Sequence, residues 1–355
     1  MLSFDDIQQC GDHISPVAPA AAPGNDSDVV ISSRVRLARN FAAWPFESQL
    51  NDADRAAVLR HAKKLLAAVR PRGLTLFELF QCDPLERLLL VERHLISPEL
   101  AACRTECAVA ISDDRSLSVM IHEEDHLRIQ AMVGGFDLQR PLEMAMRLES
   151  DLSNAGTAFA ISEEFGYLTA CPTNIGSAMR AGVMLHLPGL IRTGQMDRAA
   201  RALAHLHLTL RGIYGEHSTA PGDLFQISNR ISFGKTEQET IELLEGVVPD
   251  ILEYEREART HLLTHRGAEL RELLGLTIRS LSDADASDIE ETMDRLSVLR
   301  LGTVLGLVTE LTPGQVDELF VRTQPAHIQK RIGHELEPAD IDMERARILR
   351  ESLHR

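Results

Sequence analysis

Residues 119–130 read VMIHEEDHLRIQ, and this stretch combines carboxylates, imidazoles and an arginine with apolar residues that alternate. An alternation of period two predicts a β-strand with two different faces. The apolar face holds Leu117, Val119, Ile121, Leu127 and Ile129. The polar face holds His122, Glu124, His126, Arg128 and Gln130. We therefore predict a strand with one face in the core and the other face available for chemistry.

The polar face has three interpretations. A charged strand face is usually only solvated, but three consecutive acidic residues beside Arg128 are costly unless a ligand or partner charges organise them. The letters HEEDH also fit the H-E-x-x-H pattern of zinc hydrolases, in which two histidines and a glutamate base share one helical face. Because the alternation predicts a strand and no third ligand is evident nearby, zinc is the weakest interpretation.

The composition is that of an ordinary globular protein. With 355 residues and 44% hydrophobic residues, the chain can bury a sizeable core and is expected to form two domains. Its 37 basic and 53 acidic residues give a net charge of -16, which argues against a nucleic-acid-binding surface over most of the protein. We find no apolar run of about 20 residues and no signal-peptide pattern, so we expect a cytoplasmic protein without a membrane segment. Five scattered cysteines without a C-x-x-C pair are typical of free thiols in a reducing compartment.

The segments around the central stretch predict alternating strands and helices. Residues 1–28 are expected to form a flexible leader, because residues 15–28 are rich in proline, alanine and small polar residues. Residues 29–37 predict a strand. Further strands are expected over residues 165–170 and 224–233, and helices over residues 52–69, 142–152, 175–187 and 197–210. From residue 236 onward the pattern is helical, and we place a domain boundary near residue 260.

Arginines occupy distinctive places in these elements. Arg34 and Arg36 share one face of the first strand, opposite Val35 and Leu37, and such a pair is either a solvated edge or a phosphate clamp. The full set is Arg34, Arg36, Arg128, Arg180 and Arg211. If these residues converge, they would neutralise a nucleoside triphosphate without a P-loop. The Gly-Lys-Thr at residues 234–236 is not a P-loop, because Asn229 stands where that motif needs glycine.

Several blocks of sequence resemble the phosphagen (guanidino) kinases. They are SSRVRLARN, ERHLISPEL, EEDHLRIQ, CPTN followed by an arginine-bearing segment, RGIYGEHS and FQISN, in this order. The resemblance runs from about residue 29 to the end and fits the protein arginine kinases best. It implies an α+β fold in which residues 29–258 form a large antiparallel sheet flanked by helices. Residues 259–355 would then form an all-helical C-terminal domain, with a possible part in dimerisation and phosphoarginine binding.

The resemblance also implies roles for individual residues. Glu124, Glu216 and Cys171 fall on catalytic positions, namely two carboxylates and a cysteine beside the guanidinium. The positions implied in ATP binding are Ser32, Ser33, Arg34, Val35, Arg36, His94, Arg128, Arg180, Ala181, Gly182, Val183, Met184, Arg211, Gly212, Ile213, Tyr214, Gly215 and Glu216. Mg²⁺ would be held by ATP oxygens and water, with no metal ligand from the protein.

The chemistry of these residue types agrees with the implied roles. A guanidinium has a pKa above about 12, so it must be held and relieved of a proton before it can act as a nucleophile. Two carboxylates can grip its planar N–H edges while one of them accepts the proton. A thiolate at Cys171, stabilised by the local positive charge, would help to orient the group.

The identity of the acceptor follows from the start of the chain. Phosphagen kinases for small substrates carry a helical domain before the first arginine strand, whereas only residues 1–28 stand there in this sequence. We expect an open site and an ATP-dependent protein arginine kinase, which marks proteins for degradation or regulates stress-response factors. The alternatives are a kinase for free arginine or another small guanidino compound, and a catalytically silent regulatory member. Arginine-containing proteins, an adaptor, an AAA+ protease and a second copy in a homodimer are the partners that the resemblance implies.

The C-terminal segment departs from the family pattern. Protein arginine kinases carry an RDxxRA motif that binds phosphoarginine, and residues 341–346 read IDMERA at the matching place. Asp342, Arg345 and Ala346 match the motif, but Ile341 replaces its first arginine. One charge-assisted contact to phosphate is therefore missing. We expect either a weakened allosteric site or a solvated helix end.

Overall fold

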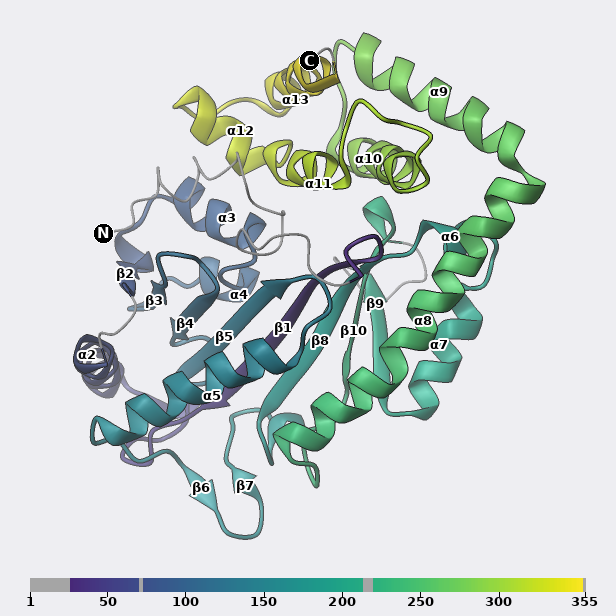
Figure 1. Ribbon diagram of the computed structural model, residues 1–355. Coiled ribbons are helices and arrows are strands. Elements are labelled where there is room, and N and C mark those ends of the chain that lie inside the picture. The colour runs from purple at the N-terminus through teal and green to yellow at the C-terminus, as the bar shows by residue number, and fades with distance from the viewer. Residues whose placement is uncertain (1–25, 70–72, 213–219, 354–355) are drawn as a thin grey trace.

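An eight-stranded antiparallel sheet forms the centre of the computed structural model, which describes residues 26–69, 73–212 and 220–353 (Figure 1). The strand order is β2-β3-β4-β5-β1-β8-β10-β9. The strands of this sheet are β1 (Val30–Arg39), β2 (Thr75–Glu78), β3 (Ala108–Ile111), β4 (Leu117–Ile121), β5 (Leu127–Gly134), β8 (Met179–His186), β9 (Leu208–Gly212) and β10 (Leu224–Asn229). A separate small hairpin consists of β6 (Ile161–Ser162) and β7 (Gly166–Tyr167).

Strand β1 comes first in the chain but lies in the middle of the sheet, between β5 and β8. Val35 and Leu37 are fully buried in the main core, as the alternation predicts. Arg34 and Arg36 alternate with them along the strand and face the other side, where they line a cavity. The register pairs Arg36 with Arg180 of β8. Arg34, Arg36 and Arg180 therefore present their guanidinium groups on the same face of the sheet.

Long helices cover the apolar face of the sheet. These are α2 (Asp52–Ala68), α5 (Gln139–Asn154) and α8 (Glu237–His265), and α5 and α8 cross in front of the sheet in Figure 1. The predicted helices over residues 52–69 and 142–152 are confirmed. The Asn51 side chain accepts a hydrogen bond from the backbone N–H of Asp54, and Thr236 and Glu239 form a capping box. These side chains satisfy backbone donors at the first turns, which explains where α2 and α8 begin.

The other face of the sheet is covered only at its margins. Helices α3 (Pro84–Glu92) and α4 (Pro98–Ala101) pack near β2, β3 and β4 around a small core, and the C-terminal helices pack near the ends of β1, β5, β8 and β10 around another. These C-terminal helices are α9 (Gly267–Asp283), α10 (Ile289–Val304), α11 (Pro313–Arg322), α12 (Pro325–Ile332) and α13 (Pro338–Leu353). The predicted class, a helix-flanked antiparallel sheet followed by a helical C-terminal region, is confirmed.

Shorter helices complete the connections. Helices α6 (Pro188–Arg192) and α7 (Met196–His205) lie between β8 and β9. The 3-10 helices are η1 (Glu47–Gln49), η2 (Leu79–Gln81), η3 (Pro172–Asn174) and η4 (Pro221–Asp223).

The central sequence stretch forms a hairpin, so the prediction of one continuous strand was wrong. β4 ends at Ile121, β5 begins at Leu127, and these two residues are paired across the ladder. Paired residues point to the same face of a sheet, so the period of two continues through the turn and hides it from a reading of the sequence. His122 begins the turn with φ of 63°, a left-handed conformation. The predicted apolar face is nevertheless the one that enters the main core.

One predicted helix was wrong, and another is present but ends earlier than expected. Residues 179–186 form strand β8, and the predicted helix over residues 197–210 ends at His205 before β9 begins. β8 lies between two neighbours with almost all of its residues buried, so it is apolar on both sides and lacks a clear period. Residues 207 and 178, just before these two strands, both adopt positive φ. The short strand expected over residues 165–170 is only β7, and that over 224–233 ends at Asn229.

The first described residues lie against helices α8 and α10. Asp26 and Asp28, counted with the leader in the sequence, form a turn whose carboxylates pair with Arg256 of α8. The carbonyl oxygen of Asp28 accepts hydrogen bonds from Arg259 and Arg300, at 3.0 and 2.9 Å. Helix α8 continues through the proposed boundary at residue 258 without a break. In the ranges that the structure describes, no helix is both long and apolar enough to cross a membrane.

Candidate active site

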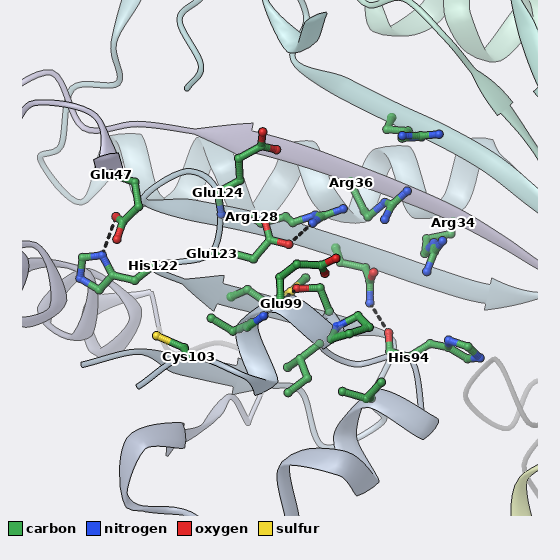
Figure 2. A pocket seen from close by; sticks show the side chains of 18 of the residues that line it. Arg34, Arg36, Glu47, His94, Glu99, Cys103, His122, Glu123, Glu124 and Arg128 are labelled. Atoms are coloured by element: carbon green, nitrogen blue, oxygen red, sulfur yellow. Dashed lines mark hydrogen bonds and ion pairs between the residues drawn. The ribbon is translucent and has the colours of Figure 1, made fainter. Parts of the chain in front are cut away.

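Five arginines from neighbouring strands line one cavity of about 1280 Å³ (Figure 2). Arg34 and Arg36 come from β1, Arg128 from β5, Arg180 from β8 and Arg211 from β9. The convergence expected from the sequence is therefore present. Arg180 takes part because it lies on a strand and not on the predicted helix, which sets it beside Arg36 in the ladder.

The arginine cluster has few matching anions. Burial, followed by the charges of Arg128 and Arg180, lowers the pKa of the Arg34 guanidinium to about 10. Burial and the neighbouring guanidinium groups also lower the pKa of Arg36, with only Glu123 opposing them. The buried Nε of Arg36 has no hydrogen-bond partner within the described ranges. Buried cations without partners are unfavourable, so this half of the cavity is suited to a polyanion such as a triphosphate.

Neutral side chains orient the guanidinium groups. The Nη2 of Arg34 donates to the Gln226 side-chain oxygen at 2.8 Å. The Nε and Nη2 of Arg180 lie 3.4 and 3.3 Å from the Ser228 hydroxyl. Both partners stand on β10, two residues apart and therefore on one face of that strand. Because neither partner carries a charge, the arginines are held in place without being neutralised.

His94 also lines the cavity, but as an uncharged group. Burial, and then the charge of Arg34, lowers the pKa of the imidazole to about 4. The backbone at His94 has φ of 55°, and its carbonyl oxygen accepts a hydrogen bond from Gln130 at 2.8 Å. A neutral imidazole held beside Arg34 adds no further positive charge to the cluster.

Other positions expected at the nucleotide divide into two groups. Met184 and Gly212 line the cavity, whereas Val35, Ala181 and Val183 point into the main core on the opposite face.

The second group also contains two serines and a glycine. Ser32 and Ser33 are buried, and the Ser33 hydroxyl donates to the carbonyl of Gly135. A Cβ at Gly182 would lie 2.4 Å from the carbonyl of Ile227, so glycine is needed for the close approach of β8 and β10. The residues of the second group match the family motifs, but their side chains do not line the cavity.

The turn between β4 and β5 carries the acidic half of the cavity. Glu123 forms an ion pair with Arg128, and Figure 2 shows the Glu124 carboxylate pointing away from that pair. Burial would raise the pKa of Glu123, but Arg128 and hydrogen bonds outweigh it and lower the pKa. Asp125 is buried and accepts hydrogen bonds from the Asn40 side chain and the Ala170 N–H, at 2.6 and 2.7 Å. Of the three acidic residues, Glu124 is the one left exposed.

Glu124 lies near the corner that contains Cys171. Burial, and then the charges of Asp125 and Glu123, raises the pKa of Glu124, while a hydrogen bond from Cys171 opposes the rise. The Asn174 side chain is 3.5 Å from the same carboxylate, and Thr173 Oγ1 is 3.0 Å from the Cys171 sulfur. A carboxylate with a raised pKa and an adjacent thiol suits acid–base work on a polar acceptor. The second expected carboxylate, Glu216, lies outside the described residues, as do Ile213, Tyr214 and Gly215.

The zinc-hydrolase interpretation was wrong, because its two histidines lie in a strand–turn–strand segment and not on a helix. His122 uses Nδ1 with Glu47 at 2.8 Å and Nε2 with the carbonyl of Arg55 at 3.0 Å. His126 accepts from the Phe41 N–H at 3.1 Å and donates to the carbonyl of Pro45 at 2.9 Å. Both imidazoles hold the turn in place and have no free ring nitrogen for a metal.

Sequence reasoning missed several residues that line the cavity. They are Glu47, Arg55, Glu99, Cys103, Gln226 and Gln324. Gln226 and Ser228 alternate along β10, so a period-two reading of the FQISN block would have found them. No local pattern could reveal Gln324, which reaches the cavity from the C-terminal helices.

The expected allosteric residues lie on α13. Arg345 is 1% exposed, and it donates to the carbonyls of Thr323 at 2.8 Å and Ser287 at 2.6 Å while pairing with Asp342. Ala346 is fully buried. Arg345 therefore anchors α13 to neighbouring helices, and its guanidinium is not displayed on the surface.

Comparison with known proteins gives two matches to family models. Residues 58–258 match the family described as ATP:guanido phosphotransferase, C-terminal catalytic domain, and residues 269–355 match the protein-arginine kinase McsB C-terminal domain. Curated relatives named protein-arginine kinase include those of Brevibacillus brevis, 41% identical over 93% of both chains, and Shouchella clausii, 42% identical over 93% of both chains. The Bacillus subtilis relative is 38% identical, over 93% of this chain and 92% of its own.

Solved structures share the fold. A lombricine kinase superimposes with a TM-score of 0.58 and 22% identity, over 71% of this chain and 76% of its own. The duplicated taurocyamine kinase from Schistosoma mansoni, with bound transition-state-analogue components, gives a TM-score of 0.60 and 24% identity over 72% of this chain. The match spans only 36% of that duplicated chain. At this identity the likeness concerns the fold alone.

Proposed function

The chain belongs to the protein-arginine kinases, within the ATP:guanido phosphotransferase family, and we propose that the arginine-lined cavity is where it transfers the γ-phosphoryl group of ATP to arginine side chains of proteins. The observation that carries this assignment is the convergence of Arg34, Arg36, Arg128, Arg180 and Arg211 beside an exposed carboxylate. The arginine cluster has more positive charges than nearby carboxylates, and the acidic turn at residues 123–125 lies next to it.

The arginine half of the cavity would hold the triphosphate. Guanidinium forks match phosphate oxygens and stay charged at working pH, so they position the nucleotide and stabilise the charge that develops during transfer. ATP would give Arg34 and Arg36 counter-charge, of which the described residues supply little beyond Glu123. Mg²⁺ would accompany ATP, held by nucleotide oxygens and water.

The acidic turn would hold the acceptor. A guanidinium nitrogen attacks the γ-phosphorus, the bond to the β-phosphate oxygen breaks, ADP leaves, and Glu124 takes the proton from the nitrogen. The raised pKa of Glu124 makes it a better proton acceptor than an ordinary carboxylate. Cys171 would help to orient the acceptor through its contact with the same carboxylate. The exposure of Glu124 supports access by an arginine that is attached to a protein surface.

The decisive experiment replaces the base without changing its shape. We expect Glu124→Gln to fold and bind ATP but to form phosphoarginine roughly a hundredfold more slowly, or slower still, as loss of a positioned base should. Glu164→Gln, an exposed carboxylate between β6 and β7, is the control and should leave the rate unchanged. Phosphoarginine is measured under conditions that preserve acid-labile P–N bonds. Near-normal turnover in Glu124→Gln would remove this residue from the mechanism.

The acceptor class needs its own assay. Incubation with Mg-ATP and either free arginine or an arginine-rich protein separates a protein kinase from a small-guanidino kinase. The adaptor, the AAA+ protease, the homodimer, the cytoplasmic location and a role in degradation or stress responses stay predictions.

A further inference from the structure

Helix α12 of the C-terminal region packs against α3, with its first turn beside the last residue of α3, and both helices are labelled in Figure 1. Glu92, the last residue of α3, accepts hydrogen bonds from the backbone N–H groups of Ala326 at 2.7 Å and His327 at 3.1 Å. The residue at the start of α12, Gln324, makes no side-chain capping bond of its own. A carboxylate from a distant part of the chain therefore caps this helix, where negative charge is favourable.

A histidine completes the contact in one defined tautomer. Arg93 Nε donates to His327 Nε2 at 2.7 Å, so that nitrogen must be an acceptor. His327 Nδ1 lies 2.6 Å from Glu92 and therefore carries the proton. Burial lowers the pKa of His327, which agrees with a neutral ring. Ala326 is fully buried in the small core around α3 and β3. We call Glu92, Arg93, Ala326 and His327 the α3–α12 clamp.

The clamp lies at the wall of the arginine-lined cavity. Glu92 and Gln324 line this cavity together with Arg34 and His94. His94 follows the clamp by one residue, and its backbone is fixed by its hydrogen bond with Gln130. On the other side, the Gln324 side chain donates to the carbonyl of Phe320 at 2.9 Å. His94 directly follows Arg93, and Gln324 directly precedes the first turn of α12, so the clamp sets the spacing between these two parts of the cavity wall.

We propose that Glu92 is a positioning residue for the nucleotide, because it fixes α12 against α3 and so holds the His94 and Gln324 wall of the cavity. This inference rests on the proposed function, since it assumes that ATP occupies the cavity. The C-terminal helices are then part of the nucleotide site and not only an appended domain. If ATP contacts a wall built from both segments, nucleotide binding and clamp formation must favour each other.

The chain offers a matched pair of variants on α3. In Glu92→Gln, one amide oxygen replaces a carboxylate that serves two backbone donors and an imidazole. Glu86 lies on the same helix and reaches Lys330 of α12 at 3.7 Å, but it does not line the cavity. A glutamine at position 86 also preserves the capping box of α3. The two changes remove the same charge from the same helix.

We expect Glu92→Gln to raise KM for ATP about tenfold, as loss of charge-assisted bonds suggests, with kcat within about twofold of wild type. Glu86→Gln should change neither constant by more than about twofold. A purely structural role would lower the amount of folded enzyme without raising KM. An unchanged KM in a folded Glu92→Gln enzyme would overturn the inference.

A second measurement does not depend on any variant. Hydrogen–deuterium exchange in residues 325–332 of the wild-type protein should slow when Mg-ATP is added, and this slowing should be absent from Glu92→Gln. Exchange in wild type that is indifferent to ATP would overturn the inference even if the variant does not fold. If the wild-type protein forms no phosphoarginine at all, the proposed function fails. If the wild-type protein is active and Glu92→Gln has the same KM for ATP, only the inference about the α3–α12 clamp is contradicted.

Discussion

Replacing Arg34 by methionine should stabilise the nucleotide-free protein while it weakens ATP binding. The charged Arg34 is buried beside Arg128 and Arg180, and its pKa falls from 12.5 to about 10. Because the pKa of Arg34 is lower in the folded state than in the unfolded state, its positive charge destabilises the folded protein at every pH below about 10. This destabilisation disappears as the pH rises towards 12.5 and the guanidinium loses its proton in both states. At about 1.36 kcal/mol per pKa unit, the cost near neutral pH is about 3 kcal/mol.

The net gain is smaller than this cost because one hydrogen bond is lost. Gln226 loses the guanidinium that donates to it at 2.8 Å, which costs about 1 to 1.5 kcal/mol. A net stabilisation of about 2 kcal/mol remains. For 355 residues the unfolding entropy is about 0.75 kcal/mol/K, so the Tm should rise by about 3 °C. The lost phosphate contact should weaken ATP binding about ten- to a hundredfold.

Arg39 on the same strand gives the matched control with the opposite sign. It forms two hydrogen bonds with Glu149, at 2.7 and 3.1 Å, and lies over the Tyr167 ring at 3.5 Å. Arg39→Met leaves the buried carboxylate of Glu149 without its cationic partner, which costs about 3 to 5 kcal/mol. The Tm should therefore fall by about 4 to 7 °C. Both residues are arginines of β1, and the main difference between them is that Arg39 has a paired carboxylate whereas the partner of Arg34 is the uncharged Gln226.

Thermal unfolding with and without Mg-ATP tests both variants. Wild type should gain stability from ATP by mass action, and Arg34→Met should gain much less. A lower Tm for the Arg34→Met apoprotein, together with an undiminished response to ATP, would refute the reasoning. It would show that the cluster is balanced by charges within the protein and that Arg34 has no part in nucleotide binding.

Three further predictions concern the acceptor half and the C-terminal helix. Burial and nearby anions raise the pKa of Glu124 above 4.5, so kcat/KM should fall as acidification protonates this base. A pH–rate profile should show this fall with a midpoint above pH 4.5, and a midpoint below that value would contradict the assignment. Cys171→Ser keeps Glu124 and should lose less than the roughly hundredfold expected for the base, and a folded but inactive variant would reverse this ranking. Phosphoarginine should activate ATP turnover weakly or not at all, because Ile341 supplies no guanidinium and that of Arg345 is buried among carbonyl groups. Strong activation of the unmodified protein at micromolar phosphoarginine would show that another residue replaces the missing arginine.

The part of the site that could be predicted lies on strands with a clear alternation. Val35 and Leu37 enter the core, so Arg34 and Arg36 must face the other way. Arg128, Arg180 and Arg211 stood out by their local settings, and the family resemblance then assigned them to one nucleotide site without giving the geometry of that site. It placed Arg180 correctly at the cavity even though the local pattern predicted a helix there.

The parts that escaped prediction depend on contacts between distant segments. The hairpin at residues 122–126 was hidden because pairing across a turn preserves a period of two. The C-terminal motif was read as a surface site, but Arg345 is buried among carbonyl groups that only the helical packing brings together. The clamp joins residues more than 230 positions apart, and no local pattern in either segment indicates it.

The central place of β1 has a consequence for how the protein is made. β1 ends at Arg39, but its partner β8 ends roughly 150 residues later, which at about 5 to 20 residues per second is roughly 7 to 30 s of synthesis. The hydrogen bond between the Asp28 carbonyl, just before β1, and Arg300 can form only later still, because Arg300 lies 272 positions downstream. An arginine-bearing strand with unpaired edges thus precedes its neighbours out of the ribosome. A stalled or truncated chain should lack the nucleotide site and pair through these edges with other chains.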